Sequence, residues 1–232
     1  QLNLNYSKSI WSYCVQNKVP LVYASSAATY GAGEQGYMDD ESALDTLRPL
    51  NPYGLSKHQF DQWVMQQSTH PPHWYGLKFF NVYGHRESHK GRMASMIYHG
   101  FNQIQAGGSV RLFRSHREGI ADGEQKRDFI YVKDIVRVIE WLLTDAPTSG
   151  IYNLGTGEAR SFNDLIRAVF KAMDRPARIE YIDMPEDLRE TYQYFTQAPM
   201  QKLQKAGYRS DFYSLEDGVA DYVRNYLLPE AN

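Results

Sequence analysis

A short apolar run near the start of the chain ends abruptly in hydroxyl side chains. Val19 to Ala24 has the length and composition of a buried β-strand, and Ser25, Ser26 and Thr29 follow it closely. Open α/β sheets place their ligand crevice at the carboxyl ends of parallel strands. The run therefore favours an α/β fold in which Ser26 lies at the edge of a binding site.

The next signal is a helix start that carries a Tyr-x-x-x-Lys pair. Asn51 is a favourable N-cap and Pro52 a favourable first residue, so a helix is predicted from about Tyr53. Lys57 follows one turn later on the same face, and its charge and the helix dipole both favour a phenolate at Tyr53. The pair is thus a candidate proton-transfer unit. The alternative is a packed phenol beside a solvated lysine.

The rest of the chain alternates strand and helix signals. Residues 31–49 are polar and acidic and are interpreted as a surface loop. Met93, Met96 and the apolar residues after them recur at helical spacing, which predicts a buried face. Further strands are expected at 73–80, 110–113, 126–131, 151–154 and 178–182, and further helices at 7–16, 132–143, 161–173 and 214–227.

Composition excludes several classes of function. The formal charge of −2 predicts no general attraction to nucleic acid or to an anionic membrane, and no apolar run approaches a membrane span. The single cysteine, Cys14, allows no intrachain disulfide and fits a reducing, cytoplasmic setting. His85, His89 and His99 lack the spacing of a zinc protease, so no metal site is predicted.

Strand, Ser-Ser-x-x-x-Tyr-Gly and Pro-Tyr-x-x-x-Lys together resemble the extended short-chain dehydrogenase/reductase family. The resemblance implies part of a Rossmann-type, doubly wound parallel sheet and a smaller α/β substrate-binding lobe. It implies that Ser26 bonds the substrate oxygen, that Tyr53 is the acid/base and that Lys57 holds the nicotinamide ribose. Asn3 matches the helix asparagine that orders such sites, with Asn5 as a competing candidate.

A dinucleotide-binding Gly-x-x-Gly-x-x-Gly turn is not found in the sequence. Because the family carries that turn ahead of the position matching Gln1, the chain is expected to lack the N-terminal cofactor-binding portion and to be inactive by itself. The expected domains are 1–82, a partial Rossmann domain with the Ser/Tyr/Lys set, and 83–232, mainly the substrate-binding lobe with segments returning to the first domain.

Three segments are similar to the ADP-glyceromanno-heptose 6-epimerases within that family, namely 23–31, 80–95 and 192–197. The similarity implies that Lys90 is a second acid/base opposite the tyrosine and that Val82 contacts the cofactor. Arg127 is a candidate for fork-like diphosphate binding, and its alternative is a surface charge beside Glu124. Substrate contacts are expected at Asn81, Arg92, His99, Phe113, Arg114, Ser115, His116, Arg127 and Tyr192.

One stretch departs from the heptose epimerases. They usually read Phe-Glu-Gly-Ser where this chain has Phe113-Arg114-Ser115-His116 followed by a longer loop to Gln125. Arg92 stands where the family often has serine. These positions touch the nucleotide in the family, so the choice of nucleotide is left open.

The resemblance implies an isomerase that inverts C6 of the heptose in an ADP-heptose, for lipopolysaccharide inner-core precursors. Oxidation and reduction by bound NADP, or alternatively NAD, would carry out the inversion. A cytoplasmic homo-oligomer is expected, since family members form pentamers. Two alternatives are another NAD(P)-dependent epimerase, such as a UDP-hexose 4-epimerase, and a non-catalytic binding scaffold. A 4,6-dehydratase is disfavoured, because Ser26-Ala27-Ala28 lacks the usual acidic pair.

Overall fold

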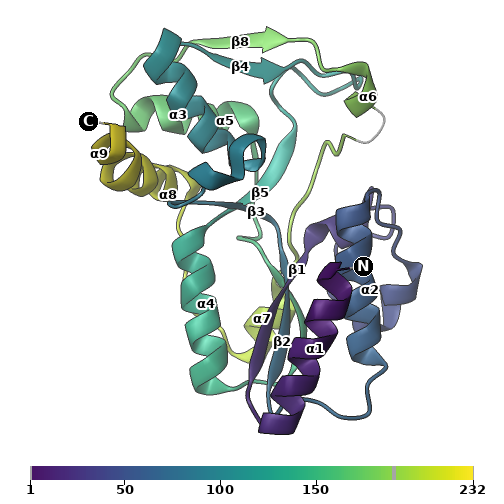
Figure 1. Ribbon diagram of the computed structural model, residues 1–232. Helices are drawn as coiled ribbons and strands as arrows, with labels where there is room; N and C mark the ends of the chain where they lie inside the picture. The colour runs from purple at the N-terminus through teal and green to yellow at the C-terminus, as the bar shows by residue number, and fades with distance from the viewer. Residues whose placement is uncertain (1, 190–191, 232) are drawn as a thin grey trace. The chain divides into compact units, whose positions relative to one another are not determined.

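The computed structural model describes residues 2–189 and 192–231, which divide into two compact units (Figure 1). The first unit consists of Gln1–Phe80, Val136–Gly157 and Ala198–Ser210. The second consists of Asn81–Ile135, Glu158–Gln197 and Asp211–Asn232. The chain is α/β, with parallel strands in both units.

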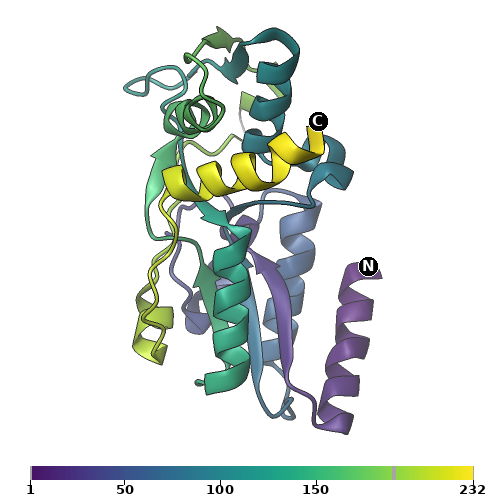
Figure 2. The ribbon, with the colours of Figure 1, turned by 90° about the vertical axis from the view of Figure 1, so that its left-hand side faces the viewer.

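The first unit is built on a parallel sheet with the strand order β1-β2-β6. Its strands are β1 (Leu21–Ser26), β2 (Trp74–Phe79) and β6 (Gly150–Leu154), and β1 pairs with β2 over its whole length. Helices α1 (Leu2–Asn17) and α2 (Pro52–Met65) lie on one side of this sheet, and α4 (Val132–Asp145) lies on the other (Figures 1 and 2).

Helix α2 begins where the sequence predicts. The Asn51 side chain accepts a hydrogen bond of 2.8 Å from the backbone N–H of Gly54, and Pro52 is the first helical residue. This cap satisfies one of the free N–H groups of the first turn. Tyr53 is consequently held at the start of a regular helix.

The second unit packs three helices against short strands. Helices α3 (Met96–Gly107), α5 (Phe162–Ala172) and α8 (Leu215–Tyr222) share an apolar core with β3 (Asn81–Tyr83) and β5 (Lys126–Tyr131). The predicted capping box at Ser161 and Asp164 is present at the start of α5. The remaining elements are β4 (Val110–Phe113), β7 (Ala159–Ser161), β8 (Ile179–Ile182), α6 (Glu186–Arg189), α7 (Gln201–Ala206), α9 (Leu228–Ala231), a π-helical turn (Val223–Leu227) and the 3-10 helices η1 (Ala27–Tyr30), η2 (Glu41–Thr46) and η3 (Ser88–Met93).

The predicted burial of Met93 is wrong. Its side chain is 84% exposed, because α3 starts only at Met96 and Met93 ends the separate turn η3. Gly91 bends the backbone within that turn at φ 53°, and the Ser95 side chain caps α3. The helical periodicity of the apolar residues therefore begins at Met96.

The acidic segment 31–49 is also less exposed than predicted. The Asp39 carboxylate is buried and accepts a hydrogen bond of 2.8 Å from the backbone N–H of Asn153 in β6. Glu41 accepts one from the N–H of Ile151 and forms an ion pair with Lys202. Since these carboxylates bond to an edge strand of the sheet, the segment covers that edge.

The described helices are short, and the longest of them, α1, has 16 residues. Within residues 2–189 and 192–231, none has both the length and the apolar character needed to cross a membrane. In the same residues, His, Cys, Asp and Glu side chains form no group of three or more that could hold a metal ion.

Candidate active site

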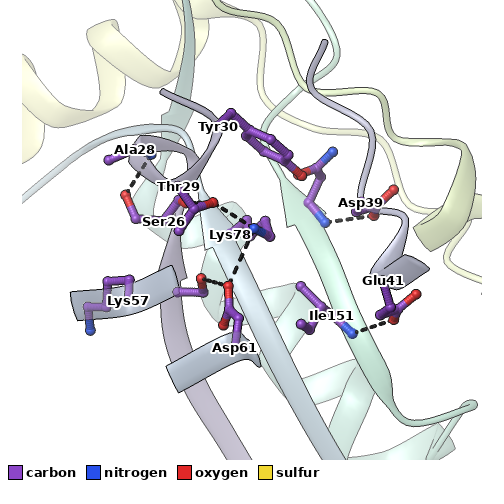
Figure 3. Close-up of polar contacts among 12 residues, drawn as sticks. Ser26, Ala28, Thr29, Tyr30, Asp39, Glu41, Lys57, Asp61, Lys78 and Ile151 are labelled. Atoms are coloured by element: carbon purple, nitrogen blue, oxygen red, sulfur yellow. Dashed lines mark hydrogen bonds and ion pairs between the residues drawn. The ribbon is translucent and has the colours of Figure 1, made fainter. Parts of the chain in front are cut away.

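Ser26 ends β1 and caps the 3-10 helix η1. Its Oγ accepts a hydrogen bond of 3.1 Å from the N–H of Ala28 (Figure 3), and its carbonyl accepts one of 2.8 Å from the Thr29 hydroxyl. A serine hydroxyl that accepts from a backbone N–H keeps its own proton for donation. The half-buried Ser26 hydroxyl is thus positioned to donate to a ligand oxygen at the carboxyl end of the strand.

Lys57 connects the first turns of α2 to the same strand. Its ammonium donates a hydrogen bond of 2.8 Å to the carbonyl of Ala24 and lies 5.9 Å from the centre of the Tyr53 ring. Burial lowers the pKa of Lys57, and the charge of Asp61 opposes that effect. Among the described residues, Ala24 is the one hydrogen-bond partner of this ammonium, which leaves N–H groups for a ligand.

The Tyr53 side chain is half exposed, and no other described side chain bonds to its hydroxyl. A phenol in this setting is open to a ligand while a cation lies beside its ring. Ser26 at the end of β1 and Tyr53 and Lys57 at the start of α2 therefore lie on two elements that the Lys57 bond to Ala24 joins, and their common role stays a prediction. Proton transfer to or from a bound alcohol is chemistry that this set can perform.

A glycine permits the close approach between α2 and the Ser26 turn. A Cβ added to Gly54 would lie 2.7 Å from the carbonyl oxygen of Ala28 and 3.2 Å from Cβ of Pro49. Backbone atoms do not yield to such an overlap as a flexible side chain would. Gly54 therefore sets the distance between the turn that holds Ser26 and the helix turn that holds Tyr53.

Gly54→Ala is expected to lower kcat for the reaction at this site by about tenfold or more, because the added methyl group moves α2 away from Ala28. Alanine is the better helix former, so the helix itself gains stability. Steady-state kinetics and thermal unfolding of the same preparations separate the two effects. The matched control is Gly107→Ala in α3, where an added Cβ meets no atom within 4 Å and native kinetics are expected. Native kcat in Gly54→Ala would contradict this account.

Asn3 and Val82 occupy less distinctive positions. Asn3 lies in the first turn of α1 with an exposed side chain, and among the described residues no hydrogen bond joins it to Ser26 or Tyr53. Val82 is the middle residue of β3 in the second unit and pairs with Ile130. The roles of both residues stay predictions.

The donors at the end of β1 suit a nicotinamide ribose, whose hydroxyls accept from ammonium groups such as that of Lys57. The pyrophosphate of such a cofactor needs a glycine-rich turn that opens a helix. The sequence does contain Gly31-Ala32-Gly33-Glu34-Gln35-Gly36, but this segment follows η1 and leads into a loop rather than opening a helix. A Cβ at Gly31 would overlap the carbonyl of Arg48, so that glycine serves close backbone packing instead. Among the described residues, the fit to a cofactor is thus limited to the nicotinamide end.

In the second unit, Lys90 lies on the exposed turn η3. The buried Glu87 carboxylate fixes this turn, since it accepts hydrogen bonds of 2.7 Å from the Ser95 N–H and 2.6 Å from the Ser95 hydroxyl. Among residues 2–189 and 192–231, no hydrogen bond or ion pair engages the Lys90 ammonium. Lys90 is therefore a cation on an anchored turn, available to a ligand.

The same unit contains a pocket of about 760 Å³, a volume typical of small-molecule sites. Four of the predicted substrate residues line it, namely Arg92, His99, Phe113 and Tyr192. The rings of Phe113 and Tyr192 meet edge to face at 6.5 Å. Aromatic walls with cationic side chains suit a ligand that has both a flat ring and negative charge.

Other predicted substrate residues do not line this pocket. Arg114 donates to the carbonyl of Tyr181, and the backbone N–H groups of Ser115 and His116 are bonded to Asp122 and to the Tyr194 hydroxyl. These contacts hold the strand and loop together. Asn81, an exposed residue of β3, is likewise absent from the pocket lining.

The surface-charge alternative for Arg127 is wrong. The residue is buried, and its guanidinium donates to the carbonyls of Lys126 and Gln193. The Tyr192 ring lies 5.3 Å from its carbon Cζ. Arg127 thus supports the pocket wall formed by Tyr192 instead of lining the pocket itself.

Sequence reasoning missed several pocket residues. Gln125 is buried, and its amide donates long hydrogen bonds to the carbonyls of Phe113 and Arg114. Gln103 accepts a hydrogen bond from the N–H of Arg111. No local motif marks these residues, because they come from α3, β4 and a loop that meet only in the folded unit. The pocket residues not predicted are Met96, Gln103, Arg111, Leu112, Gln125, Phe162 and Ile182.

Comparison with known proteins adds independent findings. Residues 1–155 match the sequence profile of the NAD dependent epimerase/dehydratase family. The ADP-L-glycero-D-manno-heptose-6-epimerase of Fusobacterium nucleatum is 52% identical over 98% of this chain and 71% of its own length. The protein of the same name from Alkalilimnicola ehrlichii is 44% identical over 95% of this chain and 68% of its own length.

Solved structures agree with these sequence matches. The Helicobacter pylori ADP-L-glycero-D-manno-heptose-6-epimerase superposes with a TM-score of 0.80 and 29% identity over 96% of this chain. This chain spans 65% of that protein's length. The Thermus thermophilus UDP-glucose 4-epimerase, solved with NAD, has a TM-score of 0.73 and 26% identity, with coverage of 95% of this chain and 68% of its own.

Proposed function

Because the chain belongs to the NAD dependent epimerase/dehydratase family, we propose that the protein interconverts the two C6 epimers of an ADP-glyceromanno-heptose. The observation that carries the proposal is 52% identity over 98% of the chain to a heptose epimerase, together with the Ser26, Tyr53 and Lys57 set at the end of β1. The product class is the heptose precursor of the lipopolysaccharide inner core.

The proposed cofactor is NADP, with NAD as the alternative. When bound, the cofactor would supply reversible hydride transfer, and inversion of a carbon that has no acidic proton would result when the hydride is returned to the opposite face of the ketone. Lys57 would hold the nicotinamide ribose through the N–H groups that Ala24 leaves free, and Val82 is proposed as a further contact. Asn3 is kept as a proposed ordering residue near the site.

Ser26 and Tyr53 would act on the reacting oxygen. The Ser26 hydroxyl, oriented by the Ala28 N–H, donates a hydrogen bond to the substrate oxygen. Tyr53 takes the proton from that oxygen as the alcohol becomes a ketone and returns it in the reverse step. The charge of Lys57 beside the Tyr53 ring favours the phenolate that accepts this proton.

A ketone that presents its other face needs a proton-transfer group in a second orientation. Lys90 is proposed for this role, because its ammonium is exposed and has no partner among the described residues. The pocket formed with Arg92, His99 and Tyr192 is proposed to hold the nucleotide, with its rings against the base and its cations towards the diphosphate. Asn81, Arg114, Ser115 and His116 remain proposed substrate contacts on loops and strands of this unit.

The decisive experiment is an epimerisation assay of the full-length natural protein with ADP-D-glycero-D-manno-heptose. NMR of the sugar side chain is expected to show conversion to the L-glycero epimer until the two forms reach equilibrium. UDP-glucose in a parallel reaction tests the 4-epimerase alternative. Turnover of UDP-glucose without turnover of the heptose would overturn the proposal in favour of that alternative.

The proposal extends to the setting of the enzyme. Nicotinamide cofactors and activated sugars belong to the cytoplasmic pool, so the cytoplasm is the proposed location. A homo-oligomer is proposed on the resemblance to the heptose epimerases, and analytical ultracentrifugation of the natural protein would measure it.

Lys90→Met keeps the aliphatic stem and removes the ammonium. Conversion between the epimers is expected to fall about 10²-fold or more if Lys90 transfers a proton, while the affinity for ADP stays native. NMR assays and calorimetric titration with ADP measure the two quantities. Lys171→Met, which removes an exposed cation from the end of α5, is the matched control and should behave as wild type. If Lys90→Met loses affinity for NADP as strongly as it loses epimerisation, Lys90 would instead be identified as a cofactor anchor.

A further inference from the structure

We propose that Thr29, supported by the buried ion pair of Lys78 and Asp61, is a positioning residue that holds Ser26 in its working orientation. The inference rests on the proposed function, since Ser26 matters only if it bonds the substrate oxygen. Thr29 lies within η1 and is fully buried, so it would act through Ser26. The contacts of these residues lie within the first unit (Figure 3).

Two opposite charges are buried below the site. The Lys78 and Asp61 side chains are 1% and 0% exposed, and Nζ lies 3.4 Å from Oδ2. Lys78 comes from β2 and Asp61 from α2, and the Lys78 ammonium also lies 4.5 Å from the centre of the Tyr30 ring. A buried ion pair is on average no more stabilising than apolar side chains of the same size. Its presence here is therefore not explained by stability alone.

Asp61 fixes the catalytic helix against β1. Its carboxylate accepts hydrogen bonds of 2.6 Å from the Ser25 hydroxyl and 3.1 Å from the Tyr23 hydroxyl. Asp61 follows Lys57 by four residues and Tyr53 by eight, so all three lie along one side of α2. The bonds to β1 therefore restrain rotation of the helix that presents Tyr53.

Lys78 transmits the same restraint to Ser26. Its ammonium donates a hydrogen bond of 2.6 Å to Thr29 Oγ1, and the Thr29 hydroxyl donates one of 2.8 Å to the Ser26 carbonyl. An ammonium can only donate, so Thr29 Oγ1 must accept from Lys78 and its proton must point to Ser26. The direction of the hydroxyl is thus determined, and the chain of bonds from Asp61 to Ser26 has one arrangement.

Tyr53 and Ser26 are therefore positioned relative to the same buried ion pair. Tyr53 is placed by the helix that Asp61 anchors, and Ser26 is placed by the turn that Lys78 and Thr29 anchor. An error of about 1 Å between groups that must both reach one substrate oxygen can cost about 10²-fold in rate. The buried pair would suppress that error.

The test compares Thr29→Val with Thr29→Ser in the full-length protein. Valine keeps the shape and loses the hydroxyl, and serine keeps the hydroxyl and loses a methyl group. We expect kcat per folded molecule to fall about 10- to 100-fold in Thr29→Val with little change in KM, and to stay within about twofold of wild type in Thr29→Ser. Thermal unfolding is expected to show a lower Tm for both variants. A fall in kcat in Thr29→Val alone then cannot result from the lost stability.

Tyr75→Phe is the matched control, because it removes the hydrogen bond of another buried hydroxyl, to the Pro147 carbonyl, without touching Asp61 or the Ser26 turn. It should lower Tm and leave kcat native. Native kcat in folded Thr29→Val, or an equal fall in kcat in Tyr75→Phe and Thr29→Val, would overturn the inference. If Thr29→Val does not fold, the double variant Lys78→Met/Asp61→Leu replaces the ion pair by apolar groups, and native kcat in that variant would overturn it equally.

The wild-type assay separates this inference from the proposed function. Absence of heptose epimerisation in the wild type would reject the proposed function itself. Wild-type epimerisation together with native kcat in Thr29→Val would reject only the positioning role of Thr29.

Discussion

Tyr53→Phe is expected to lower kcat for heptose epimerisation by about 10²-fold or more, with KM for the ADP-heptose nearly unchanged. The phenol is half exposed and no described side chain bonds to its hydroxyl, so its removal takes nothing from the packing of α2. The loss would therefore fall on proton transfer rather than on folding. NMR of reactions quenched at successive times, at saturating substrate, measures the rate of epimerisation, and thermal unfolding checks that Tm is native.

Tyr13→Phe supplies a matched control for the loss of a phenol. Tyr13 is similarly exposed, lies on α1 in the same unit and has no role in the proposed chemistry. Native kcat is expected in that variant. Near-native turnover of the heptose in Tyr53→Phe would remove Tyr53 from the mechanism, whatever the effect of the other variants.

Lys78→Met is expected to have the largest effect on stability. Asp61 would be left buried and charged without its partner, which typically costs about 3 to 5 kcal/mol in the free energy of unfolding. Burial lowers the pKa of Lys78, and Asp61 is the main carboxylate that raises it, with smaller contributions from Asp39 and Glu41. Urea denaturation followed by circular dichroism gives the change in unfolding free energy.

Two further variants test the cause of that loss. Lys133→Met breaks the partly exposed ion pair with Asp221 in the second unit and should cost no more than about 1 kcal/mol. The double variant Lys78→Met/Asp61→Leu should recover most of the stability lost in Lys78→Met, because no buried charge remains. A double variant as unstable as Lys78→Met would show that packing, not charge, causes the loss.

Much of the fold follows from local signals. The capped start of α2 at Asn51 and the capping box of α5 involve residues close together in sequence, so their hydrogen bonds could be predicted. The apolar runs that form β1 and β2 are recognisable by composition alone. Met93 shows the limit of such reasoning. The helical spacing of the apolar residues extends to Met93, although α3 begins only after its cap Ser95 and Met93 belongs to the separate turn that contains Gly91.

The candidate site, like the fold, could be predicted only where local motifs place its residues. Ser26, Tyr53 and Lys57 could be proposed from two short motifs, since a strand end and a helix start place them without further information. The pocket in the second unit could be predicted only in part, because Gln103, Arg111 and Gln125 belong to no motif. Arg114 and His116 are held by hydrogen bonds to Tyr181 and Tyr194, and their contact with the substrate stays a prediction.

By itself, the sequence determined where the strands end, where the catalytic helix begins and which side chains stand at those two points. Only the tertiary structure decided that Lys78 of β2 meets Asp61 of α2, that Thr29 links this pair to Ser26 and that Asp39 is buried against β6. The physical reason is the range of the interactions. Caps and apolar runs act between near neighbours, whereas a buried charge finds its partner only when distant segments pack and exclude water.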